Sequence, residues 1–167
     1  AETDGPKPID GAQFFTRLGQ RIIHLLTTQT NSGQLYEVDM RLRPSGASGL
    51  LVSSLGAFAR YQENEAWTWE HQALVRARVL VGSQDVGQAF EKVRAAVLGK
   101  KRDLPKLRQE VSEMRAKMRD NLGSRLTAAG TAANAFEATA PFDLKQDAGG
   151  IVDIEFMVQY AALAWSE

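Results

Sequence analysis

One segment of the chain alternates between apolar and charged side chains, and this pattern restricts the fold more than any other feature. Residues 34–44 read Gln-Leu-Tyr-Glu-Val-Asp-Met-Arg-Leu-Arg-Pro. The two-residue period predicts a β-strand with one apolar and one charged face. The strand would end at Pro44, because proline has no N–H to give to a sheet. Only one or two other segments have strand character, so we expect a small and incomplete β-sheet.

The rest of the chain has the periodicity of helices. Apolar residues recur every three or four positions, and capping residues or glycines stand at most of the expected ends. We expect helices to begin at or near Asp10, Ser53 or Ser54, Trp67, Ser83, Asp103 and Ile151. The last of these helices is apolar nearly all round, which is typical of a helix buried inside a larger body.

The expected fold class is therefore α+β and predominantly helical. Residues 1–123 would hold the incomplete sheet with its attached helices. Residues 124–141 are rich in Ala, Thr and Gly and lack a period, which predicts a flexible insertion. Residues 142–167 would hold a second motif and the start of the buried helix. Because that helix runs on without a stop signal, we expect the chain to be a piece of a longer protein.

The composition excludes several classes of function. The 167 residues include 20 basic and 20 acidic side chains, so the formal net charge is zero. A nucleic-acid-binding protein would normally carry a basic excess, and no stretch approaches the ~20 consecutive apolar residues of a membrane span. We expect neither nucleic acid nor a membrane as a partner. The absence of cysteine fits a reducing, cytoplasmic location and leaves carboxylates, arginines and metal ions to carry any chemistry.

The charged face of the expected strand has a composition suited to nucleotide chemistry. Asp39, Arg41 and Arg43 would project from the same side, about 6.6–7 Å apart. A carboxylate can hold a hard cation such as Mg²⁺, and arginines neutralise phosphate oxygens. Together they suit the chemistry of a nucleoside triphosphate. The alternative is a solvated strand face covered with ion pairs, and the pattern alone does not separate the two.

The last helix carries polar residues that need an explanation. Glu155 and Gln159 are four positions apart and share a face, whereas Asp153 points elsewhere. Asp153 lies in the first turn, where the helix dipole favours a negative charge. Glu155 has no such explanation, so we expect it to have a metal, an arginine or another partner.

Three motifs resemble the glutamine synthetase adenylyltransferase family (glutamate–ammonia-ligase adenylyltransferase). They are YEVDMRLRPSGASGLLVSS at residues 36–54, NEAWTWEHQALVRARV at 64–79 and FDLKQDAGGIVDIEF at 142–156. The resemblance covers nearly the whole chain except residues 124–141. Members of this family have two related nucleotidyltransferase halves: one attaches AMP from ATP to a tyrosine of glutamine synthetase, and the other removes it by phosphorolysis.

Within the first two motifs, residues 36–39 and 64–69 are more similar to the carboxy-terminal, adenylylating half. The deadenylylating half is an alternative within the family. A second alternative is a helical interaction module, built on the apolar seam Leu104–Leu122, that docks glutamine synthetase or a PII-type regulator. The resemblance implies a role in nitrogen assimilation, a cytoplasmic location, and glutamine synthetase and ATP as partners.

The resemblance also implies roles for particular residues. It gives residues 1–123 a partial nucleotidyltransferase fold, with Mg²⁺ as the cofactor and Asp39 as the third carboxylate of its metal site and a catalytic residue. The residues implied to bind phosphate are Arg41, Arg43 and Lys145. Those implied to support the cleft are Glu37, Asp153 and Glu155.

One expected part of the family pattern is missing from this sequence. The Gly-Ser turn and the Asp-x-Asp strand that supply the first two carboxylates would lie just before Ala1. A single aspartate does not hold two metal ions about 3.5–4 Å apart. We therefore expect this chain by itself to be inactive.

Overall fold

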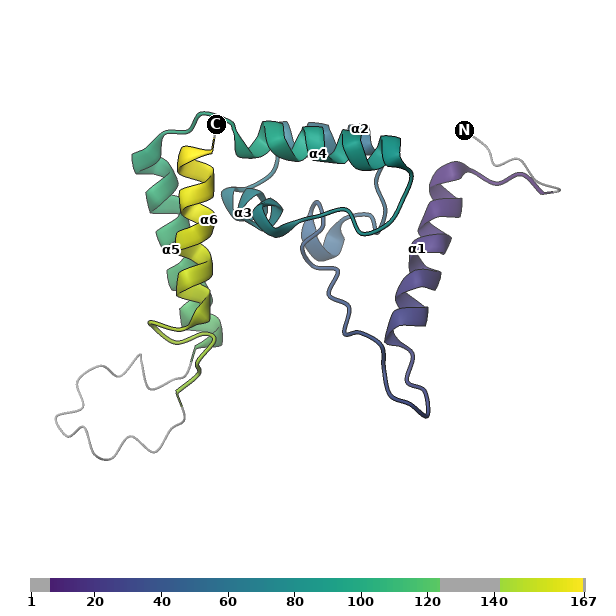
Figure 1. The fold of residues 1–167 in the computed structure, drawn as a ribbon, viewed down its shortest axis with the longest axis horizontal. Coiled ribbons are helices and arrows are strands. Elements are labelled where there is room, and N and C mark those ends of the chain that lie inside the picture. The colour runs from purple at the N-terminus through teal and green to yellow at the C-terminus, as the bar shows by residue number, and fades with distance from the viewer. Residues whose placement is uncertain (1–6, 124–141, 167) are drawn as a thin grey trace. The chain divides into compact units, whose positions relative to one another are not determined.

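The structure is a computed structural model that describes residues 7–123 and 142–166. In these ranges the chain forms six α-helices and one short 3-10 helix (Figure 1). It divides into two compact units, unit 1 (Ala1–Ala66) and unit 2 (Trp67–Glu167), each described by itself. The predicted insertion at residues 124–141 lies outside the described residues.

Unit 1 contains α1 (Gly11–Thr27), the 3-10 helix η1 (Gly46–Ser48) and α2 (Leu55–Asn64). Both predicted helix starts are confirmed. Asp10 Oδ1 accepts hydrogen bonds from the backbone N–H groups of Ala12 and Gln13, at 2.9 and 3.3 Å. Ser54 Oγ accepts from Ala57 N–H at 3.2 Å. These short polar side chains satisfy amides that the first helical turn leaves without partners.

The predicted strand over residues 34–43 is wrong. Between residues 7 and 123 and between 142 and 166 there is no strand, and the bridge between Thr30 and Gly33 is an isolated one. The segment is irregular, and its Tyr36 N–H donates to Leu26 O at 3.0 Å instead of to a ladder. Alternation fixes which side chains share a face, but a strand is stabilised by the neighbour that pairs with it. Among the residues that the structure describes, no second extended segment pairs with this one. The predominantly helical part of the prediction is therefore confirmed, and the sheet is not.

Unit 2 contains α3 (Thr68–Arg76), α4 (Gln84–Leu98), α5 (Leu104–Leu122) and α6 (Ile151–Trp165). The predicted caps of α4 and α5 are confirmed. Ser83 Oγ accepts from Val86 N–H at 3.5 Å, and Asp103 Oδ1 accepts from Lys106 N–H at 3.0 Å. Figure 1 shows α5 and α6 lying side by side.

The core of unit 2 lies between α5 and α6. Leu107 and Val111 of α5 are buried against Leu163 of α6. Four partly buried residues pack around this cluster: Leu98, Phe156, Tyr160 and Ala164. Burying each large side chain contributes about 1.5–3 kcal/mol. The apolar seam of α5 is therefore used inside unit 2, which leaves less of it for docking a partner.

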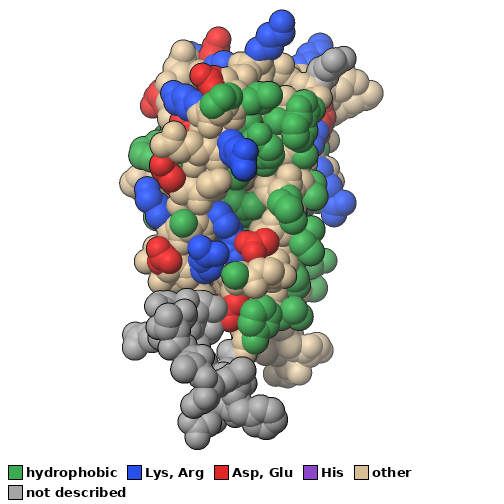
Figure 2. All heavy atoms as spheres, turned by 90° about the vertical axis from the view of Figure 1, so that its left-hand side faces the viewer, with side chains coloured by type: hydrophobic (Ala, Val, Ile, Leu, Met, Phe, Trp, Pro, Cys, Tyr) green, Lys and Arg blue, Asp and Glu red, His purple; other side chains and the backbone are tan. Residues whose placement is uncertain are grey.

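Helix α6 is buried on one side and exposed on the other. Val152 and Leu163 are buried, whereas large apolar side chains on the rest of the helix are about half exposed or more: Ile151, Ile154, Met157, Val158 and Trp165. Figure 2, which faces the α5 and α6 side, shows hydrophobic side chains gathered along one edge of this face. Across the described ranges, no helix combines the length and apolar character needed to cross a membrane.

Candidate functional site

The predicted catalytic residue, Asp39, lies in a loop of unit 1 and forms an ion pair with Arg41. Arg41 Nη2 donates to Asp39 Oδ2 at 2.7 Å, Nε lies 3.0 Å from both carboxylate oxygens, and the Arg41 backbone N–H donates to Oδ1 at 2.8 Å. Both side chains are exposed, by 50% for Asp39 and 82% for Arg41. The carboxylate of Asp39 is therefore accessible to solvent, although both of its oxygen atoms accept hydrogen bonds from Arg41.

The contact with Arg41 also favours the ionised form of Asp39. Hydrogen bonds from the Arg41 side chain, and then from its backbone N–H, lower the pKa of Asp39 from 3.8 to about 2. A hydrogen bond to the ionised form stabilises that form. Asp39 is consequently an anion at neutral pH, which is the state needed to bind a cation.

Arg43 holds the loop together instead of pointing freely into solvent. Its Nε, Nη1 and Nη2 donate to the carbonyl oxygens of Gly49, Met40 and Ala47, at 3.2, 2.5 and 3.1 Å. Three of the five donors of the guanidinium group are thus used by its own loop. A phosphate could meet only the remaining donors without displacing a carbonyl group.

The turn that follows Pro44 requires glycine at position 49. A Cβ atom at position 49 would lie 1.9 Å from the Pro44 carbonyl oxygen, so only glycine fits this turn. Ser45 has a positive φ of 59°, and its N–H donates to the Tyr61 hydroxyl group of α2 at 3.0 Å. The loop is therefore anchored to the helix that follows it.

The loop does not form a metal site by itself. Glu37, the other acidic residue of the motif, is exposed in the same irregular segment. Within the described part of the chain, no group of three or more Asp, Glu, His or Cys side chains could hold a metal ion. Magnesium prefers a nearly octahedral set of oxygen ligands. The described residues alone do not fit the Mg²⁺ ion that the resemblance implies.

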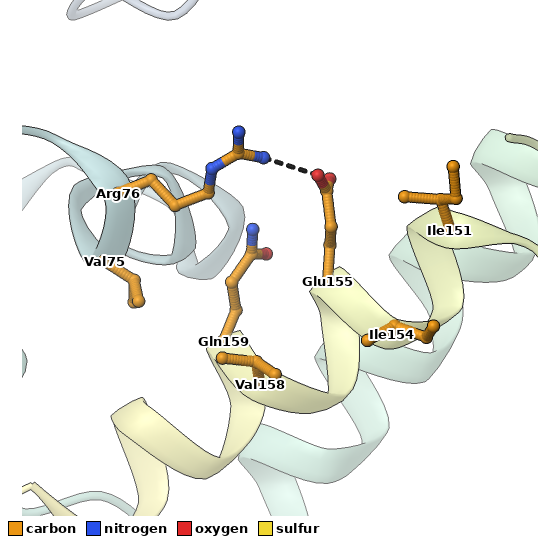
Figure 3. Close-up of a pocket in the computed structure, with 7 residues that line it drawn as sticks. All are labelled: Val75, Arg76, Ile151, Ile154, Glu155, Val158 and Gln159. Carbon is orange, nitrogen blue, oxygen red and sulfur yellow. Dashed lines mark hydrogen bonds and ion pairs between the residues drawn. The ribbon is translucent and has the colours of Figure 1, made fainter.

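Glu155 and Gln159 line a cavity of about 220 Å³ between α3 and α6 of unit 2 (Figure 3). Its walls are mostly apolar, and Val75 and Arg76 contribute from the α3 side. Arg76 Nη1 donates to Glu155 Oε1 at 2.5 Å. Of the partners expected for Glu155, the structure thus provides an arginine, and the prediction that Glu155 and Gln159 share a face is confirmed.

The arginine belongs to a polar row on α3 that sequence reasoning missed. Thr68, Gln72 and Arg76 are four residues apart, and all three point at α5 or α6. The Thr68 hydroxyl group donates to Glu110 Oε2, and Gln72 Nε2 donates to Gln159 Oε1 at 3.2 Å. The four-residue spacing was the available signal, but the partners lie about 40 to 90 positions away and have no local signature.

Asp153 faces the opposite way and meets Arg115 of α5. Arg115 Nε donates to Asp153 Oδ1, and the Gly149 N–H donates to Oδ2 at 2.6 Å. The Gly149 hydrogen bond and then the Arg115 hydrogen bond lower the pKa of Asp153. Arg115 is buried and was not among the predicted residues, although an arginine four positions after buried Val111 in an apolar seam was a signal.

Lys145 lies in the turn before α6, with its side chain exposed and its backbone fixed. Its N–H donates to Asp143 Oδ1 at 2.8 Å, and its carbonyl group accepts from Val152 N–H at 3.1 Å. Asp39 belongs to unit 1 and Lys145 to unit 2. The common cleft predicted for the two motifs therefore stays a prediction.

Comparison with known proteins identifies the class to which this chain belongs. The family model described as glutamate-ammonia ligase adenylyltransferase matches residues 1–93, so the chain belongs to that family. Its similar relatives are proteins named bifunctional glutamine synthetase adenylyltransferase/adenylyl-removing enzyme. The chain is 88% identical over 165 residues to the one from Pseudomonas syringae pv. tomato and 87% identical over 166 residues to the one from Pseudomonas putida. It is 60% identical over 164 residues to the one from Hahella chejuensis.

The similarity covers nearly all of the chain but a small part of each relative. The matches to the two Pseudomonas proteins include 99% of this chain and 17% of the relative, and the match to the Hahella protein includes 98% and 16%. The chain therefore spans about a sixth of the length of these relatives. The resemblance inferred from the three motifs is confirmed at the level of the family.

Proposed function

We propose that this chain is part of an enzyme that transfers AMP from ATP to a tyrosine hydroxyl group of glutamine synthetase. The family match and the relatives' names support an adenylyltransferase. Those names also include adenylyl removal, so the choice of the adenylylating direction rests on the motifs at residues 36–39 and 64–69. The reaction takes place in a longer enzyme, in the cytoplasm, and a PII-type regulator belongs to the same proposal.

The observation that carries the proposal is the state of Asp39. Its carboxylate is half exposed and its pKa is about 2, so it remains ionised while accessible to a partner. Arg41 holds it through an exposed pair, a kind of contact that typically contributes about 0–1 kcal/mol. A stronger cationic partner can therefore replace Arg41 at little cost. In the proposal Asp39 supplies one carboxylate to a Mg²⁺ site whose other ligands come from elsewhere in the longer enzyme.

The remaining predicted residues have two kinds of role in the proposal. Arg41, once released by Asp39, and Lys145 have the exposed cationic groups that suit phosphate oxygens. Arg43 supports the loop through three carbonyl groups and reaches phosphate only with its remaining donors. Asp153 and Glu155 brace the cleft through Arg115 and Arg76, and Glu37 is an exposed neighbour of Asp39.

The test needs an enzyme of full length. The Pseudomonas putida relative, with its matching segment replaced by this chain, provides one, and we call it the chimeric enzyme. Asp39→Asn in the chimeric enzyme should reduce transfer of labelled AMP to glutamine synthetase by at least about 1,000-fold, since the charge that holds a cation is lost. The melting temperature should stay the same because Asp39 is exposed.

Two controls accompany this experiment. Asp85→Asn, at an acidic residue in the first turn of α4, removes the same charge and should leave the rate of AMP transfer unchanged. The 167-residue chain alone should transfer no label, because one carboxylate does not complete the site. Full activity of the Asp39→Asn enzyme would remove Asp39 from the mechanism.

A further inference from the structure

The turn before α6 contains an unusual density of hydrogen bonds for a segment that lies largely at the surface. Asp143 Oδ1 accepts from Lys145 N–H and Gln146 N–H at 2.8 and 3.0 Å. The fully buried Asp147 accepts from Asp143 N–H through Oδ2 at 2.8 Å. The backbone of residues 143–147 is thus held by the side chains of Asp143 and Asp147, which accept hydrogen bonds from backbone amides of the same turn.

The same turn is fastened to the first residues of α6. Ile151 N–H donates to Leu144 O at 2.9 Å, and Val152 N–H donates to Lys145 O at 3.1 Å. These amides belong to the first helical turn, which has no partners inside the helix. The turn therefore substitutes for a side-chain cap, and its position and that of α6 are set together.

Arg115 of α5 contacts both the turn and the first turn of α6. Its Nη2 donates to Gln146 O at 2.8 Å and lies 3.4 Å from Asp147 O, while its Nε donates to Asp153. The guanidinium group is buried, and its Nη1 is without a hydrogen-bond partner in the described residues. Burying an arginine in this way is costly unless its contacts hold something in place.

The side chain that this assembly presents is Lys145. The turn fixes the Lys145 backbone on both its N–H and its carbonyl side, and Arg115 grips the next carbonyl group at Gln146. The Lys145 side chain remains exposed. A flexible ammonium group on a rigid backbone can be held near one place without being buried, and groups that act on bound phosphates need such preorganisation.

We propose that Arg115 is a positioning residue that fixes the turn at residues 143–150, so that Lys145 presents its ammonium group to the phosphates of the nucleotide. Arg115 does not itself touch the nucleotide. This inference rests on the proposed function, because it assigns Lys145 to the nucleotide site.

A double-mutant cycle in the chimeric enzyme tests the inference. The variants are Arg115→Gln, Lys145→Gln and the double variant, and the measured quantities are the KM for ATP and kcat of AMP transfer. Each single variant should raise the KM for ATP about tenfold or more, because a misplaced contact group loses most of its contribution. The double variant should be no worse than Lys145→Gln, since Arg115 acts through Lys145.

Arg108→Gln is the matched control, because Arg108 is an exposed arginine on the same helix. It should leave both kinetic parameters unchanged. Additive effects in the double variant would overturn the inference, because Arg115 would then act independently of Lys145. A normal KM for ATP in Lys145→Gln would also overturn it, whereas the proposed function would still be decided separately by Asp39→Asn.

Hydrogen exchange provides a readout that does not depend on activity. Arg115→Lys keeps the charge but lacks the planar fork that reaches Asp153 and Gln146 together, and it is the variant to use if Arg115→Gln does not fold. Peptides that cover residues 142–152 should exchange faster in Arg115→Lys, while peptides that cover residues 104–114 of α5 should not. Unchanged exchange over residues 142–152 would show that Arg115 does not fix the turn and would overturn the inference.

Discussion

At the scale of single residues, the pKa of Asp39 depends on its neighbour Arg41. The pKa of Asp39 is lowered from 3.8 to about 2 chiefly by the Arg41 side chain. Arg41→Gln should therefore raise the pKa of Asp39 towards 3.8. The folded carboxyl group would then begin to take up a proton as the pH falls below about 5, whereas in the native protein this occurs about two units lower. An NMR titration of the Asp39 carboxyl carbon measures the shift.

An unchanged titration of Asp39 in Arg41→Gln would show that the ion pair does not form in solution. A lowered pKa of Asp39 would then need another cause than Arg41.

Gly49 gives a second prediction at this scale. Gly49→Ala would place a Cβ atom 1.9 Å from the Pro44 carbonyl oxygen, so the backbone of the loop must move. We expect the free energy of unfolding to fall by about 1–3 kcal/mol. Thermal or urea unfolding of the chain measures the change.

Gly56→Ala is the matched control for Gly49→Ala. Gly56 lies inside α2, and a Cβ atom there would meet the flexible end of Arg60 at 3.6 Å. This variant should stabilise the chain by up to about 1 kcal/mol, because alanine favours a helix over glycine. Equal effects of the two substitutions would contradict the geometry of the loop.

At the scale of elements, the two acidic residues of α6 hold the helix with different strength. The Arg115–Asp153 pair is largely buried, with side chains 10% and 26% exposed, whereas the Arg76–Glu155 pair is 67% and 36% exposed. Asp153→Asn should therefore lower the free energy of unfolding by about 3 kcal/mol, since it leaves Arg115 buried without its counter-charge. Glu155→Gln should cost less than about 1 kcal/mol. Urea unfolding of both variants compares the two pairs.

The dependence of this difference on pH follows from the direction of the shift. The pKa of Asp153 is lowered in the folded protein. The stability that Asp153 contributes is thus present above its unfolded pKa of about 4 and is lost as the pH falls through the lower folded value. The gap between Asp153→Asn and the native protein should narrow in acid, and a constant gap down to pH 2 would contradict the pairing with Arg115.

The elements differ in how well the sequence alone predicted them. Helix starts at Asp10, Ser83 and Asp103 were correct because a cap and the amides it binds lie within three residues of each other. The strand at residues 34–43 failed because its pairing partner is a separate segment that the alternation does not specify. Partners at long range were missed for the same reason, as with Arg115, which is 38 positions from Asp153.

In the candidate site, too, the residues themselves were predictable from the sequence and their long-range contacts were not. The sequence predicted Asp39, Glu155 and the turn with Lys145 as functional residues. The structure shows which groups each of them contacts. The sequence allowed a metal, an arginine or another partner for Glu155, and only the folded chain shows Arg76 beside it. Sequence patterns predict which side chains share a face, whereas the identity of the facing group depends on how helices pack.

At the scale of the whole molecule, the chain is a part of an adenylyltransferase family whose members are about six times longer. Its exposed apolar surface agrees with that. Five large apolar side chains of α1 are at least 41% exposed, namely Phe14, Phe15, Leu18, Ile22 and Leu25, and α6 has a similar exposed side. Several large apolar side chains exposed along one helix are typical of faces that contact other protein.

In the proposed function, Asp39 serves the attachment of AMP and not its removal. The most direct measurement follows both reactions in the chimeric enzyme with Asp39→Asn, using the mass of glutamine synthetase as the readout. We expect AMP attachment to be lost while phosphate-dependent removal of AMP continues. Continued attachment of AMP would contradict this expectation and would place Asp39 outside the chemistry of attachment. Loss of AMP removal alone would also contradict it and would place this chain in the deadenylylating half of the enzyme.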